Sequence, residues 1–135
     1  YDRRVSRHRD RRGRGLRGPL AHPSVPAMAT RAEAFDDLVA DTAQRFREVL
    51  GRRWGSVEFA VEDIPPSDPA GWEEAVPLAR LWPAQGPLPA RIVVYRRPVE
   101  TVAPGAERGD LVHDVLVEQV ALLLGVDPDE VDPDR

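Results

Sequence analysis

The chain of 135 residues contains no cysteine, no lysine and no asparagine. The absence of cysteine excludes disulfide bonds, thiolate zinc sites and cysteine nucleophiles. All 19 basic residues are arginine, so no single arginine is taken as a functional signal. Long apolar runs are also missing: none reaches the roughly 18 residues that cross a membrane, and no signal-peptide pattern follows the first arginines. We therefore expect a cytoplasmic protein with no membrane partner, stabilised by packing alone.

Charge is unevenly distributed along the chain. Residues 1–22 carry eight arginines and two aspartates, whereas residues 23–135 carry eleven arginines and 21 acidic residues. Because residues 1–29 combine six glycines and prolines with almost no apolar periodicity, they are predicted to form a disordered arm before one folded domain, residues 30–135. The arginines of residues 1–22 could contact nucleic-acid phosphates. No aromatic residue is interleaved with them for base stacking, which favours a solvated tail.

Two helices are predicted from apolar spacing. The stretch from Asp110 to Gly125 holds the longest apolar run, and its few polar residues recur at helical spacing, which indicates a mostly buried helix. An amphipathic helix is predicted over residues 30–50, with Thr30 and Glu33 as a capping box and Gly51 as its stop. Its apolar face includes Val49, while Asp36 lies off that face.

Residues 127–130 have the cap, proline and acid of a short terminal helix.

Three strands are predicted between these helices. Residues 57–62 alternate apolar and polar side chains, which is typical of a half-buried strand. Residues 91–96 contain three consecutive β-branched side chains and favour an interior strand that ends at Pro98, while residues 75–81, broken by Pro77, favour an edge strand. Residues 67–71 are expected to be a surface loop. The predicted fold is α+β: a small three-stranded mixed sheet packed against the N-terminal amphipathic helix and the buried penultimate helix.

The segments VEFAVEDIPP, VPLARL and RIVVYRRPVE, followed by an apolar helix that ends in Leu-Gly-Val-Asp, resemble a minimal zincin-like metallopeptidase family of bacteria. The resemblance covers about residues 30–132. It implies a compact zincin-like fold in which the penultimate helix carries the motif HExxHxxGxxD. In that motif two histidines four residues apart bind zinc from one helical face, the glutamate is general base for the bound water, and a residue beyond the glycine is the third ligand.

The motif is degenerate in this chain. Aligning its glycine with Gly125 places Glu118 at the first histidine, Gln119 at the glutamate, Leu122 at the second histidine and Pro128 at the third ligand. Glu118 could donate a carboxylate oxygen, but the Gln119 amide cannot accept the proton of water, and Leu122 and Pro128 offer no side-chain lone pair. We therefore expect neither zinc nor a catalytic residue, with Leu122 filling the vacated pocket. The resulting hypothesis is a pseudoenzyme kept as a binding or regulatory scaffold.

An active metallopeptidase with a different ligand set is the alternative hypothesis. Its ligands would come from His113, Asp114 and Glu118, with help from residues 127–129. His113 and Glu118 are five residues apart, about 140° around a helix, so one ion would strain to reach both. A solvated His113 in the first helical turn is therefore favoured. The sequence has no serine in a nucleophile-elbow pattern and no glycine-rich phosphate loop.

Overall fold

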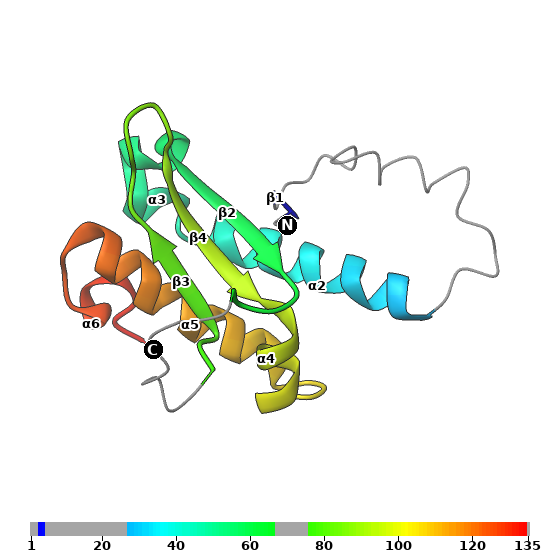
Figure 1. Ribbon diagram of the computed structural model, residues 1–135. Coiled ribbons are helices and arrows are strands. Elements are labelled where there is room, and N and C mark those ends of the chain that lie inside the picture. The colour runs from blue at the N-terminus through cyan, green and yellow to red at the C-terminus, as the bar shows by residue number, and fades with distance from the viewer. Residues whose placement is uncertain (1–2, 5–26, 67–75, 135) are drawn as a thin grey trace.

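A computed structural model describes residues 3–4, 27–66 and 76–134. The elements in chain order are strand β1 (Arg3–Arg4), helices α2 (Ala27–Gln44) and α3 (Arg47–Leu50), the 3₁₀ helix η2 (Gly51–Ser56), strands β2 (Val57–Glu62), β3 (Ala79–Trp82) and β4 (Ala90–Tyr95), and helices α4 (Arg96–Val102), α5 (Arg108–Leu124) and α6 (Pro128–Val131). Figure 1 shows the sheet in front of α2 and α5. The predicted α+β class is confirmed.

The sheet has the strand order β1-β2-β4-β3 and is mixed. Strands β2 and β4 run parallel, with Val57 opposite Ala90. Strand β3 runs antiparallel to β4, with Ala79 opposite Val94, and forms one edge. The predicted interior and edge positions of these strands are confirmed. The two-residue strand β1, which pairs antiparallel with β2, was not predicted.

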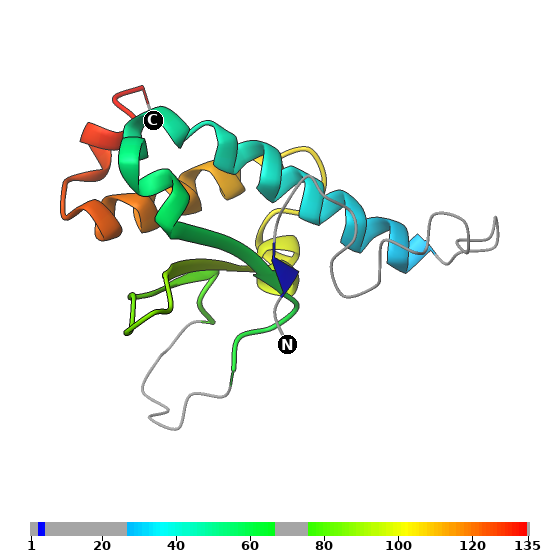
Figure 2. The same ribbon diagram turned by 90° about the horizontal axis from the view of Figure 1, so that it is seen from above.

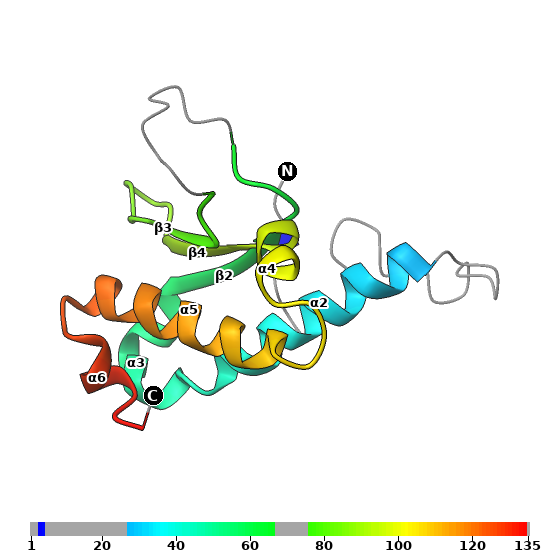
Figure 3. The same cartoon turned by 90° about the horizontal axis from the view of Figure 1, so that it is seen from below.

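One hydrophobic core lies between the sheet and the two long helices. Figures 2 and 3 show α2 and α5 side by side on the same face of the sheet. The predicted inward residues of β2 are buried there, together with side chains from β4 and both helices: Phe35, Val39, Val57, Phe59, Val61, Ile92, Val94, Val112, Leu116 and Val120. The opposite face of the sheet has its own small buried cluster of Ala60, Val93 and Tyr95. Burial of this aliphatic surface is the main stabilising contribution.

The first helix differs from its prediction at both ends. Helix α2 begins at Ala27, so Thr30 lies within the helix and the predicted N-cap at Thr30 is wrong. The helix ends at Gln44, and a turn separates it from α3 and η2. This break rotates the chain, so that Val49 is 39% exposed although its spacing placed it on the core face. Asp36, whose spacing placed it off the core face, is instead buried.

Helix α4 was missed because Pro98 was interpreted as the end of a strand. Strand β4 ends at Tyr95, and Pro98 is the third residue of α4. A proline is tolerated there because the first N–H groups of a helix have no intrahelical partner. The backbone N–H of Arg97 instead donates to the carbonyl of Asp63 at 3.0 Å, which ties the start of α4 to the end of β2.

The C-terminal elements match their predictions closely. Helix α5 ends at Leu124, and Gly125 adopts a left-handed φ of 72° while its N–H donates to the carbonyls of Ala121 and Leu122. Helix α6 starts with a complete capping box between Asp127 and Glu130. The predicted loop at residues 67–71 lies outside the described residues. In the described part of the chain, every helix is too short or too polar to span a lipid bilayer.

Within the predicted arm, residues 1–29, the structure describes only residues 3–4 and 27–29, and these belong to β1 and α2. The remaining arginines of the arm, and with them the predicted nucleic-acid contact, lie outside the described residues.

Candidate functional site

The positions that the sequence analysis aligned with the HExxH part of the motif lie on the outer side of α5. The inner side of the same turns carries Val117, Val120 and Ala121, which are buried in the core. Glu118 is exposed and Gln119 is half-buried. Glu118 and Gln119 therefore lie on the side of α5 that faces away from the core, and the expectation of a mostly buried helix fails at residues 122–124, which are exposed or half-buried.

Leu122, which the sequence analysis aligned with the second histidine of the motif, is 65% exposed. The expectation that it fills the vacated pocket is therefore wrong. Its side chain instead lines an open groove of about 630 Å³. The groove lies between the C-terminal end of α5, η2 and the connection from β3 to β4, and most of its wall is leucine and proline: Leu81, Pro83, Pro87, Leu88, Pro89, Leu122 and Leu123.

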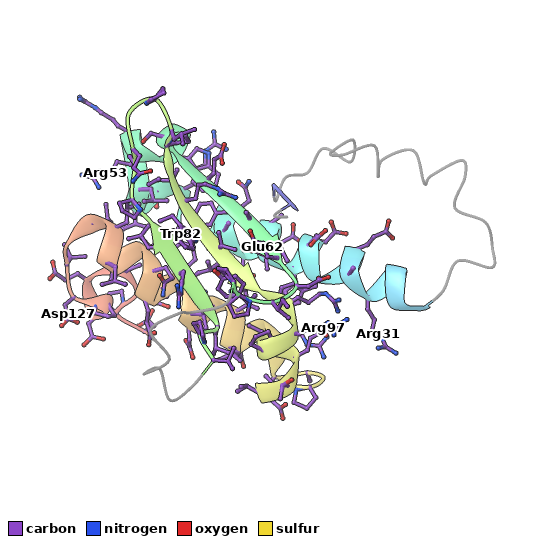
Figure 4. The ribbon with its side chains drawn as sticks, viewed as in Figure 1. Arg31, Arg53, Glu62, Trp82, Arg97 and Asp127 are labelled. Atoms are coloured by element: carbon purple, nitrogen blue, oxygen red, sulfur yellow. The ribbon has the colours of Figure 1, made fainter. Side chains whose placement is uncertain are left out.

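Polar groups in this groove are few. Arg53 is the one charged residue among the described lining residues, and it is labelled beside α3 in Figure 4. Its Nη1 donates to the carbonyl of Leu123 at 3.1 Å, which joins η2 to the last turn of α5. Ser56 Oγ donates to the carbonyl of Arg53 at 3.0 Å. Neither residue could be singled out from the sequence, because arginine stands at every position that carries a permanent positive charge and Ser56 belongs to no motif.

The edge strand β3 borders the same groove through Leu81. One side of β3 pairs with β4, and no strand in the described part of the chain pairs with its other side. Trp82 at the end of β3 is 39% exposed. An unpaired edge of this kind presents backbone N–H and C=O groups that another extended chain can bond.

His113 is half-buried and contacts three neighbours, so it is not the freely solvated side chain that was expected. Its Nε2 lies 2.6 Å from Asp132 Oδ2, and Arg45 Nη1 lies 3.3 Å from its Nδ1. Because a guanidinium only donates, Nδ1 accepts from Arg45 and Nε2 carries the hydrogen donated to Asp132. The ring also stacks on Phe46, with centroids 5.5 Å apart. Both ring nitrogens are therefore engaged in structural contacts.

The residues present do not fit the zinc ion that the motif implies. A zinc site takes at least three protein ligands. Among the residues that the structure describes, no group of three or more histidine, aspartate or glutamate side chains could hold a metal ion. The alternative ligands are not brought together, since His113 is bonded to Asp132 while Asp114 and Glu118 are exposed on α5. Pro128 is the first residue of α6 and provides no donor atom.

Comparison with known proteins agrees with the fold. A family model described as zincin-like metallopeptidase matches residues 55–135, which run from the end of η2 through α6 and include the whole of α5. A search of curated proteins finds no match. The matched region starts later than the resemblance noted in the sequence, because it leaves out α2. It still spans more than half of the chain, and the chain therefore belongs to the zincin-like metallopeptidase family.

Proposed function

We propose that this domain keeps the zincin scaffold without zinc binding or peptide hydrolysis, and that it binds an extended, apolar segment of another polypeptide. The observation that carries the proposal is the position of Leu122. An exposed leucine stands where the family motif has its second histidine, and it lines an apolar groove. A leucine side chain cannot ligate a metal, but it can contact an apolar ligand.

The residues next to Leu122 also lack the groups that zinc-dependent hydrolysis requires. Zinc peptidases need a metal-bound water and a carboxylate that takes its proton. Gln119 stands at the position of that carboxylate, and a neutral amide is not a base at ordinary pH. Glu118 alone offers one ligand where three are needed.

A polypeptide is the occupant that suits the groove. The family is one of peptidases, whose substrates are polypeptides. The unpaired side of β3 can add an extended segment as a further strand, while the leucine and proline wall receives its side chains. Main-chain hydrogen bonds of this kind give affinity, and the apolar wall gives a preference for apolar side chains.

Metal content and activity test the first half of the proposal. Purified protein is dialysed against zinc without chelator, and its zinc is measured by mass spectrometry alongside cleavage of fluorescent casein. We expect neither bound zinc nor cleavage. Retention of about one zinc per chain that is lost in Glu118→Ala would contradict the proposal, and casein cleavage lost with it would establish the alternative, an active peptidase with an unusual ligand set.

Binding of an unfolded polypeptide tests the second half. The probe is reduced and carboxymethylated α-lactalbumin, and its affinity is measured by fluorescence anisotropy. Leu122→Glu places a charge in the groove and should weaken binding by about tenfold or more. Val102→Glu is the matched control, because Val102 is 62% exposed but lies on α4, outside the groove. Equal affinities for both variants would contradict a role for the groove.

A further inference from the structure

A second cavity, of about 300 Å³, lies between α2 and α4. Three of its five lining residues are arginines, and the set is Arg31, Arg96, Arg97, Glu100 and Thr101. It is separate from the apolar groove. The groove includes Val57 and Ala90, the first residues of the parallel strands β2 and β4, whereas this cavity includes Arg96, which directly follows the last residue of β4. Figure 4 shows the labelled Arg31 and Arg97 near each other, on α2 and α4, far from Arg53.

Arg96 is the fixed part of this cavity. It is 7% exposed. Its Nε donates to Asp63 Oδ1 and its Nη1 to Glu100 Oε1, each at 3.1 Å. These two charge-assisted bonds orient the guanidinium plane before any ligand arrives. In the described part of the chain, no partner bonds its Nη2, which leaves donor capacity on this group.

Arg31 and Arg97 are the available part. Both side chains are exposed, and neither forms a hydrogen bond or an ion pair with any residue that the structure describes. The three guanidinium groups face two carboxylates, those of Glu100 in the cavity and Asp63 beside it. The local balance is therefore positive, in a domain where acidic residues outnumber arginines. Such a site attracts an anion.

Glu100 adds a second requirement for the ligand. Its Oε1 accepts from Arg96, but its Oε2 is buried and has no hydrogen-bond partner among the residues that the structure describes. A buried carboxylate oxygen without a donor is costly, so a ligand that donates a hydrogen bond there is favoured. Thr101 does not meet this need, because its hydroxyl donates to the carbonyl of Arg97 at 2.9 Å.

We propose that this cavity binds a protonated phosphoryl group, either hydrogen phosphate or a phosphomonoester. The unprotonated phosphoryl oxygens accept from Arg31, Arg96 and Arg97, and the P–OH hydrogen is donated to Glu100 Oε2. Arginine suits this role because its planar guanidinium presents paired donors to phosphate oxygens. Sulfate has the same shape but carries no hydrogen near neutral pH, so the cavity discriminates against it.

Calorimetric titration tests the site with three probes: inorganic phosphate, sulfate and O-phosphoserine. At low ionic strength and about pH 6, nearly all of the inorganic phosphate and about half of the O-phosphoserine carry a P–OH hydrogen. We expect phosphate to bind with a Kd of about 1 mM or tighter, and sulfate about tenfold more weakly. Whichever phosphate probe binds more tightly identifies the source of the group, free phosphate or a phosphorylated molecule.

Variants separate this site from general electrostatic attraction. Arg31→Ala and Arg97→Ala should each weaken phosphate binding about tenfold. Arg52→Ala is the matched control, since it removes the same charge from an exposed arginine outside the cavity. Glu100→Gln should remove the preference for phosphate over sulfate. The proposal is overturned if phosphate does not bind, if sulfate binds the wild-type chain equally well, or if Arg52→Ala weakens binding as much as the cavity variants.

Discussion

His113 Nε2 lies 2.6 Å from Asp132 Oδ2, and this contact joins α5 to the chain beyond α6. The other ring nitrogen accepts from Arg45, and the ring stacks on Phe46, both in the turn that follows α2. One side chain thereby connects three segments that are distant in sequence. His113, a candidate ligand of the alternative metal site, therefore has a structural role: it holds these three segments together.

Replacing His113 by alanine should therefore destabilise the fold. The variant loses a hydrogen bond to a carboxylate, the contact with Arg45 and an aromatic pair, so we expect the free energy of unfolding to fall by about 1–3 kcal/mol. Urea denaturation measures the change. Asp114→Ala is the matched control, because the neighbouring Asp114 is exposed on the same helix and forms none of these contacts. A loss no larger than that of the control would show that the contacts of His113 contribute nothing to the free energy of unfolding.

The exposure of Leu122 gives a second prediction. Leu122→Ala should change the free energy of unfolding by less than about 0.5 kcal/mol, because the side chain is 65% exposed. Leu116→Ala removes the same atoms from a fully buried site on the same helix and should cost about 2–5 kcal/mol. Both values come from urea denaturation. Similar losses for the two variants would mean that Leu122 is packed inside a pocket in solution.

Local patterns in the sequence predicted helices and strands well where the apolar residues of a segment followed a single periodicity. The alternation of residues 57–62 gave the bounds of β2, and Gly125 marked the end of α5 because its φ of 72° suits glycine. Prediction failed where a residue has two structural uses. Pro98 can end a strand or lie in the first turn of a helix, and only the bond from Arg97 N–H to Asp63 shows which applies.

The candidate sites were harder to predict, because both are assembled by tertiary contacts. Leu122 belongs to a long apolar run and was expected to be buried, but the turn of α5 that carries it faces the open groove. Arg31 and Arg96 are 65 positions apart and no motif links them. In a chain whose basic residues are all arginine, residue type alone could not single them out.

The left-handed backbone at Gly125 gives a third prediction. Both Gly125 and Gly55 have open space where a Cβ would lie, but only Gly125 has a positive φ, of 72°. Gly125→Ala should therefore lower the free energy of unfolding by about 1–2 kcal/mol through backbone strain. Gly55→Ala should leave it unchanged or raise it slightly. Equal effects in thermal unfolding would show that the backbone relaxes without cost.

Alkaline pH should weaken the fold through Tyr95. Burial, assisted by the nearby charge of Glu62, raises the pKa of the Tyr95 hydroxyl above its ordinary value. A group whose pKa is raised in the folded state contributes stability that is full below its unfolded pKa, about 10, and is lost as pH rises through the folded pKa.

The chain suits this measurement because it lacks lysine and has Tyr1 as its only other tyrosine. Urea denaturation repeated from about pH 9 to 11 should show stability falling with pH, and Tyr95→Phe should reduce that slope. An unchanged slope in Tyr95→Phe would contradict the shifted pKa.

Restoring the family motif is the final prediction. The variant carries Glu118→His, Gln119→Glu, Leu122→His and Pro128→Asp. If the scaffold still positions these residues as in the motif, the variant should bind about one zinc per chain, because three donors then replace one. Pro128→Asp keeps the start of α6 acceptable, since an acidic side chain is favoured in the first turn of a helix.

The matched control for this variant leaves Leu122 unchanged and should bind zinc at least tenfold more weakly, because it lacks the second imidazole. Competition with a chromophoric chelator measures both affinities. Zinc binding by the control as tight as that of the full variant would show that position 122 does not face the metal. Absence of zinc from the full variant would show that the helix no longer presents these positions to a common point, and the scaffold itself would then have diverged along with its ligands.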